Sequence, residues 1–185
     1  MHALSASAVP PADRPVFVVG EREPALDLVR ALGDTSTLCA MPASRLLQDL
    51  VQAVERCPVD LDSLGAAGDA LRRPANWYRE VQVAHTRASG KIRSVEFSGM
   101  ALRRLHHLFP HAQFLVVHRL NRAIPPSRRL PALAPEWILE VDSGVAATAE
   151  AVERVLTFLG EVTESVVVDL SDHRMRSTPV AHSKR

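Results

Sequence analysis

Residues 113–118 read Gln-Phe-Leu-Val-Val-His, and residues 16–19 read Val-Phe-Val-Val before Gly20. Both runs are dominated by apolar residues and rich in β-branched ones, the pattern of strands buried on both faces of a parallel sheet. Residues 24–33 follow the first run with apolar side chains at helical spacing and end at a glycine. The chain is therefore expected to open with a strand, a turn and a helix.

The rest of the chain continues this alternation. Further strands are predicted over 37–41, 92–97, 137–141 and 165–170, and helices over 44–56, 61–72, 75–89, 99–109, 121–130 and 145–159. Strands that alternate with helices imply parallel strands joined by right-handed crossovers. The sequence thus predicts an α/β domain with a parallel sheet flanked by helices.

Composition limits the class of protein. The 185 residues are 46% hydrophobic with a formal net charge of +1, so no global field favours nucleic acid or an anionic membrane. No apolar run approaches the roughly 20 residues that span a bilayer. Residues 1–14 resemble no signal peptide and are predicted to be a disordered lead-in to a domain over 15–170, with a flexible tail over 171–185. We expect a cytoplasmic protein.

Arg119 directly follows the second buried strand, and Ser127 lies eight residues later. Ligands of open parallel sheets bind at the carboxyl ends of the strands. A guanidinium fork with a nearby hydroxyl is a good grip for a phosphate group. The pair therefore predicts a phosphate site, and the alternative is that Arg119 pairs with a carboxylate such as Asp142 while Ser127 lies in a surface turn.

Several segments, taken in order, resemble the sulfotransferases that use 3′-phosphoadenosine 5′-phosphosulfate (PAPS), in their divergent bacterial branch. Residues 15–20 (PVFVVG) are similar to the strand before the family's donor loop. Residues 101–105 (ALRRL) and 108–119 (LFPHAQFLVVHR) are similar to a helix, turn, strand and arginine of the family. Residues 149–160 end in FLG, as a late helix of the family does, and Ser127 falls at the family's serine spacing.

This resemblance implies a three-layer, P-loop-type sulfotransferase-like domain that transfers a sulfuryl group from PAPS to a hydroxyl or amine of a small-molecule acceptor. Arg119 and Ser127 would hold the 3′-phosphate of the donor or of its product, 3′-phosphoadenosine 5′-phosphate (PAP). Gly20 and Arg22 belong to the loop that would enclose the 5′-phosphosulfate. Glu96, at the end of a middle strand, is the best-placed carboxylate for a catalytic base, with Glu21 and Glu23 as alternatives.

The donor loop departs from the family form G-x-P-[RK]-S-G-T-T. Residues 20–27 read Gly-Glu-Arg-Glu-Pro-Ala-Leu-Asp, so acidic residues stand where an anion is expected. Like charges 4 Å apart repel by about 4 kcal/mol at an effective dielectric constant of 20. The alternative function is therefore a non-catalytic protein of the same fold that binds a nucleotide or a protein partner. Activity requires Arg22, and not Glu21 or Glu23, to face the ligand crevice.

Two further patterns carry less weight. His107 and His111 have the i,i+4 spacing of some metal sites, but Pro110 separates them and no carboxylate or cysteine joins them, so no metal is expected. The basic residues near Arg103 and Arg128 lack nearby aromatic side chains that could stack bases, so nucleic acid is not expected as a partner.

Overall fold

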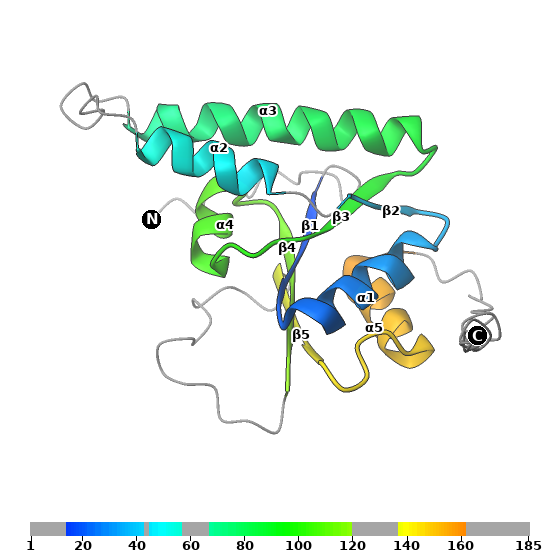
Figure 1. The fold of residues 1–185 in the computed structure, drawn as a ribbon. Helices are drawn as coiled ribbons and strands as arrows, with labels where there is room; N and C mark the ends of the chain where they lie inside the picture. Colours follow the sequence, from blue (N-terminus) through cyan, green and yellow to red (C-terminus); the bar gives the residue numbers. More distant parts are fainter. Residues whose placement is uncertain (1–13, 43–44, 57–66, 120–136, 162–185) are drawn as a thin grey trace, which may run out of the picture.

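The computed structural model describes residues 14–42, 45–56, 67–119 and 137–161 (Figure 1). These residues form five strands and five helices. In chain order the elements are β1 (Val16–Gly20), α1 (Arg22–Gly33), β2 (Leu38–Ala40), α2 (Leu46–Glu55), α3 (Ala67–Ala88), β3 (Arg93–Phe97), α4 (Leu102–Leu108), β4 (Gln113–His118), β5 (Ile138–Asp142) and α5 (Ala149–Leu159).

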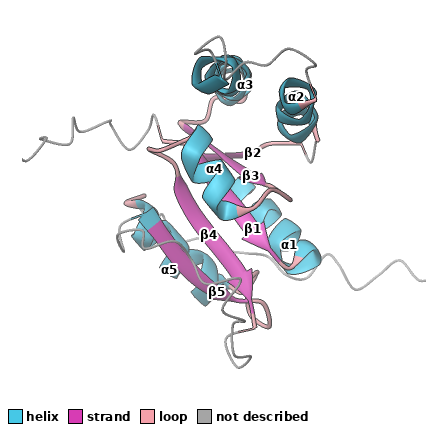
Figure 2. Ribbon diagram, turned by 90° about the vertical axis from the view of Figure 1, so that its left-hand side faces the viewer, coloured by secondary structure: helices cyan, strands magenta, loops and turns pink. Residues whose placement is uncertain are grey.

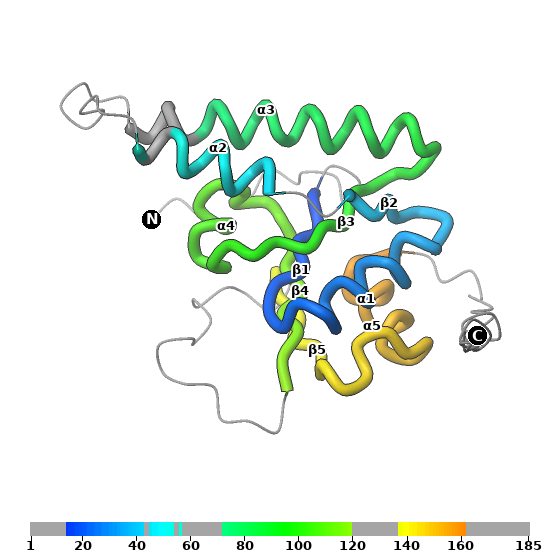
Figure 3. Tube along the Cα trace, in the orientation of Figure 1, coloured from blue at the N-terminus to red at the C-terminus, as the bar shows by residue number. Residues whose placement is uncertain are grey.

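The five strands form one sheet in the order β2-β3-β1-β4-β5, and every neighbouring pair is parallel. The path is followed most easily in Figure 3: after the central β1 the chain goes out to the β2 edge, returns through β3 and crosses to β4 and β5. In the register, Gly20 at the end of β1 lies opposite Val117, one residue before the end of β4. The predicted parallel α/β sheet is confirmed.

Helices cover both faces of the sheet, which gives three layers (Figure 2). One apolar cluster joins α1 and α5 to side chains such as Val16, Val18 and Leu115, and the other joins α2, α3 and α4 to Phe17 and Phe114. Alternate residues of β1 and β4 therefore enter opposite cores, as the two-residue period of a strand requires. This double burial explains why both strands read as continuous apolar runs.

Three helices differ from the sequence prediction by three residues or more, among them α4, which begins at Leu102 and not at residue 99. The separate helices expected over 61–72 and 75–89 are replaced, from residue 67 onward, by the single helix α3, which contains Pro74. The last helix begins four residues later than expected because Thr148 caps it: the Thr148 hydroxyl accepts a hydrogen bond from the backbone N–H of Ala151 at 3.3 Å. The glycine expected at its end is Gly160, at a φ of 72°.

The amino edge of the sheet is closed by Arg93, the first residue of β3, whose side chain is fully buried. Its guanidinium donates to the backbone oxygen of Arg14 at 2.5 Å and to Oε1 of Gln113 at 2.5 Å. It also donates to the backbone oxygen of Leu159 at 3.3 Å and lies 3.7 Å from Oε1 of Glu161. Burial, partly offset by Glu161, lowers the pKa of Arg93 to about 10, so it stays charged at neutral pH.

Several predicted segments lie outside the described residues: the lead-in up to residue 13, the helix over 121–130 with Ser127, the strand over 165–170 and the tail over 171–185. No helix in the described part of the chain is long and apolar enough to cross a membrane.

Candidate functional site

The carboxyl edge of the sheet between β1 and β4 is the candidate site. The carboxyl ends of β1, β4 and β5 point toward the bottom of the view in Figure 1. From β1 the chain leaves toward the β2 side, whereas from β4 it continues to β5 on the other side. Such a reversal between neighbouring parallel strands opens a crevice in which ligands of open α/β sheets bind.

The backbone at Gly20 sets how closely the ends of β1 and β4 approach each other. Gly20 has a φ of +120°, and a Cβ atom placed there would lie 2.0 Å from the carbonyl oxygen of Val117. The next backbone N–H, that of Glu21, donates to the same carbonyl oxygen at 2.9 Å. Only a glycine permits this approach. The ends of β1 and β4 are consequently held in contact, and the residues after each strand lie side by side.

Glu21 lies at the rim of the crevice. It is the N-cap residue of α1, yet its side chain makes no capping hydrogen bond. Instead, Oε1 of Glu21 accepts a hydrogen bond from the backbone N–H of Arg119 at 3.3 Å. The structure therefore places the Glu21 carboxylate, and not the Arg22 guanidinium, on the backbone of the residue that follows β4.

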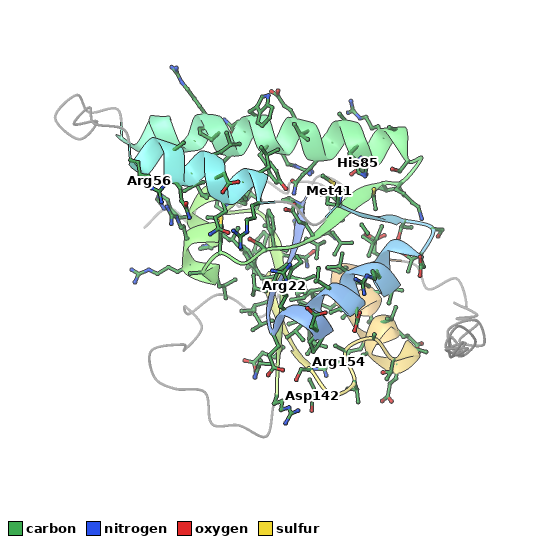
Figure 4. All side chains as sticks on the ribbon, in the orientation of Figure 1. Arg22, Met41, Arg56, His85, Asp142 and Arg154 are labelled. Carbon is green, nitrogen blue, oxygen red and sulfur yellow. The ribbon has the colours of Figure 1, made fainter. Side chains whose placement is uncertain are left out.

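Arg22, expected in the donor loop, is the first residue of α1 (labelled in Figure 4). Its side chain is largely exposed, and Nε lies 3.9 Å from Oε1 of Glu23. An exposed pair at this distance contributes little to stability, but it directs the charge of Arg22 toward a carboxylate of its own helix.

Few backbone donors remain at the start of α1. The N–H of Glu21 is bonded to Val117, the N–H of Ala25 is bonded to the carbonyl oxygen of Glu21, and Pro24 has no N–H. In the first turn only the backbone N–H groups of Arg22 and Glu23 are left without an intrahelical acceptor. A helix that begins without proline has more such N–H groups. The loop is thus poorly equipped to enclose an anion.

Arg119, the other predicted phosphate ligand, is exposed immediately after β4. No ion pair joins its guanidinium to a carboxylate within the part of the chain that the structure describes. The alternative partner, Asp142, instead accepts a hydrogen bond from the backbone N–H of Gly144 at 2.9 Å. The proposed partner Ser127 lies outside the described residues, so the Arg119–Ser127 pairing stays a prediction.

Glu96, the predicted catalytic base, is buried beneath α3 and is only 2% exposed. Its Oε1 accepts a hydrogen bond from the Tyr78 hydroxyl at 2.5 Å, and its Oε2 accepts one from Nε2 of Gln82 at 2.9 Å. Burial raises the pKa of the Glu96 carboxyl, and the two hydrogen bonds only partly oppose this effect. In the described structure Glu96 is not brought together with Glu21 and Arg119, and its role as a base stays a prediction.

One polar pair at this edge was missed by the sequence reasoning. Nε2 of His118, the last residue of β4, lies 2.9 Å from Oε2 of Glu140 on β5. The two residues are diagonal neighbours in the register, since His118 lies opposite Asp142. Polar residues at the ends of two apolar strands were the available signal. The described residues contain no group of three or more His, Cys, Asp or Glu side chains that could hold a metal ion.

No protein-family model and no curated protein matches this chain.

Proposed function

We propose that this chain is a non-catalytic, sulfotransferase-like protein that binds a nucleotide through its 3′-phosphate, with Arg119 and Ser127 as the phosphate ligands. The observation that carries the non-catalytic part is the Glu21 carboxylate, which lies across the β1–β4 crevice on the backbone N–H of Arg119. Of the two subsites that the resemblance implies, the chain would keep the one for the 3′-phosphate, at Arg119 and Ser127, and would lack the one for the 5′-phosphosulfate.

The retained half fits a phosphate group. Arg119 is exposed at the carboxyl end of β4, beside the point where the chain direction reverses, and no described carboxylate forms an ion pair with its guanidinium. A guanidinium can bind two phosphate oxygens at once, which gives both affinity and a defined orientation.

The other half does not fit a phosphosulfate. Its loop presents Glu21 at the crevice, pairs Arg22 with Glu23 and offers few backbone N–H donors. Sulfuryl transfer requires positive charge on the transferring group. Since the described loop supplies negative charge there, we derive no transfer step for this chain. Neither a small-molecule acceptor nor a catalytic base is part of the proposal.

Calorimetric titration tests this function with two ligands, adenosine 3′-phosphate and PAP, on the wild-type protein, Arg119→Ala and the control Arg103→Ala. Arg103 is exposed on α4 and keeps the net charge of the two variants equal. Loss of a charge-assisted hydrogen bond costs about 1.5–3 kcal/mol, so Arg119→Ala should weaken the tighter ligand tenfold or more. The control should bind as the wild type does.

Two results would overturn the proposal. If neither ligand binds the wild type or Arg103→Ala at millimolar concentration, the nucleotide site is absent and a protein partner becomes the better explanation. If the wild type transfers labelled sulfuryl groups from PAPS to phenolic or amine acceptors, the protein is an enzyme and Glu96→Gln is the next variant to assay.

A further inference from the structure

The helix α3 has a buried inner face and an exposed outer face that carries a tryptophan. Ala75 and Tyr78, on the inner face, are buried in the core against the sheet and α4. Trp77 lies on the other side of the helix and is 48% exposed. Tryptophan is highly buried on average in folded proteins and is enriched in protein–protein interfaces. The outer face of α3 is therefore a candidate docking surface.

The neighbouring helix α2 adds a second exposed apolar side chain to this surface. The two helices form the outer layer on one face of the sheet, and α2 runs beside α3 in the opposite direction (Figures 1 and 2). Leu46, the first residue of α2, is 38% exposed. It lies nine residues before the end of α2, and Trp77 lies ten residues after the start of α3. Leu46 and Trp77 therefore stand at a similar level along the helix pair.

Two opposite charges flank Trp77 on the same face. Arg73 precedes it by four residues and Glu80 follows it by three, so all three side chains share one side of α3. Both charged residues are exposed, and neither forms an ion pair with another residue in the described part of the chain. A twofold-symmetric interface must be complementary to itself. A cation on one side of a central residue and an anion on the other side meet this condition.

We propose that the outer face of α3, with Trp77 at its centre, is the interface of a homodimer in which α3 packs antiparallel on α3 of a second copy. A twofold axis between residues 76 and 77 places Arg73 of each copy opposite Glu80 of the other. Both charges then acquire the partner that they lack within one chain. Trp77 is covered at the centre of the contact, where the energetically dominant residues of interfaces lie.

The helix is long enough for such an interface. A stable interface buries about 800 Å² on each partner, and a round patch of that area is about 30 Å across. With 22 residues, α3 is about 33 Å long, and α2 widens the face beside it. In Figure 1, α3 lies at the top, whereas the carboxyl ends of β1 and β4 point to the bottom. Dimerisation is thus independent of the proposed nucleotide site.

Exchange of the two charges tests the geometry. Sedimentation equilibrium at about 1 to 200 µM protein compares the wild type, Arg73→Glu, Glu80→Arg and the double variant Arg73→Glu/Glu80→Arg. Each single variant places like charges opposite each other twice, whereas the double variant restores opposite charges and the net charge of the wild type. The control Arg103→Glu makes the same change in net charge as Arg73→Glu, but on α4.

We expect a concentration-dependent dimer for the wild type. An exposed ion pair changes affinity by up to about fivefold. Since symmetry doubles each pair and reversal turns attraction into repulsion, either single variant should dimerise at least about tenfold more weakly. The double variant should return to within about threefold of the wild type, and Arg103→Glu should match it. An equal mixture of the two single variants should dimerise more tightly than either variant alone.

Replacement of Trp77 tests the apolar centre of the contact. Trp77→Ala should weaken the dimer about thirtyfold or more, the range of an interface hot spot. The control Ile92→Ala removes a side chain that is 57% exposed but lies beyond the end of α3, and it should leave the dimer unchanged.

Three results would overturn the proposal. The first is a wild type that stays monomeric up to about 200 µM. The second is a double variant that dimerises no more tightly than the single variants. The third is a Trp77→Ala dimer as tight as that of the wild type, which would assign dimerisation to another face. Nucleotide titrations are unaffected by any of these results, so the proposed function stands or falls separately.

Discussion

Arg93 and Arg119 lie at opposite ends of the strands of the same sheet, and one is buried whereas the other is exposed. Arg93, at the amino edge, is fully buried, and its guanidinium is bound by four acceptors from three separate segments of the chain. Arg119, at the carboxyl edge, is exposed and is contacted by Glu21 through its backbone N–H. Residue type alone does not distinguish them, whereas burial and partners do: the first joins three segments of the fold, and the second is exposed to solvent.

The sharpest test of this comparison exchanges each arginine for alanine. Arg93→Ala should lower the free energy of unfolding by about 3–5 kcal/mol, because Glu161 and several buried acceptors lose their partner. Arg119→Ala should change it by no more than about 0.5 kcal/mol, as expected for an exposed residue. Urea denaturation followed by circular dichroism measures both. Equal losses in the two variants would break the comparison.

A second substitution tests the close backbone packing at the carboxyl edge, where Gly20 contacts Val117. Gly20→Ala combines a positive φ with a clash against Val117 and should cost about 2 kcal/mol. Gly90→Ala is the matched control, since Gly90 also has a positive φ, of 67°, but has no atom within 4 Å of the added Cβ. Thermal unfolding should show the larger loss for Gly20→Ala. A larger loss for Gly90→Ala would contradict the close approach.

The smallest expected change in stability concerns Glu96, a buried carboxyl group that accepts hydrogen bonds from two neutral donors. Arg93, in contrast, also has an ionic partner. Because burial raises the pKa of Glu96 above the ordinary value of 4.5, the fold favours its protonated form. That stabilisation is fully present below about pH 4.5 and is lost as pH rises through the folded-state pKa.

Glu96→Gln should therefore be more stable than the wild type by about 1 kcal/mol at pH 8, and the gap should close toward pH 4.5. Its amide can also donate to Oε1 of Gln82, which is buried and has no hydrogen-bond partner. Urea midpoints across this pH range provide the measurement. A gap that widens toward acid pH would show that the assigned direction is wrong.

The sequence predicted the strands of this protein better than its side-chain contacts. Apolar runs identified β1 and β4 because strands buried on both faces have few polar residues. The start of α5 was wrong by four residues because a threonine cap overrides the apolar pattern upstream, whereas its end at Leu159 was correct. The single helix α3 was divided in two because Pro74 was assumed to start a helix, although the chain accommodates it within one.

Site residues were harder to predict because they depend on which strands become neighbours. The contact between Glu21 and Arg119 joins residues 98 positions apart and exists only because β1 and β4 are adjacent and Gly20 lets them touch. The burial of Arg93 could not be foreseen either, since its acceptors come from three segments that are distant in the sequence. For Glu96 a signal was present: Tyr78 and Gln82, four residues apart, place polar atoms on the buried face of a predicted helix.

The partners of Arg93 have a consequence for engineering. A single side chain contacts the carbonyl oxygen of Arg14, before the first strand, and the carboxylate of Glu161, after the last described helix. Residues 14 and 161 are therefore neighbours in space, at the end of the sheet opposite the crevice. Proteins with this arrangement generally tolerate circular permutation. A linker that joins the segments flanking these positions, with new termini opened in a surface loop, should give a rearranged chain that keeps the same sheet.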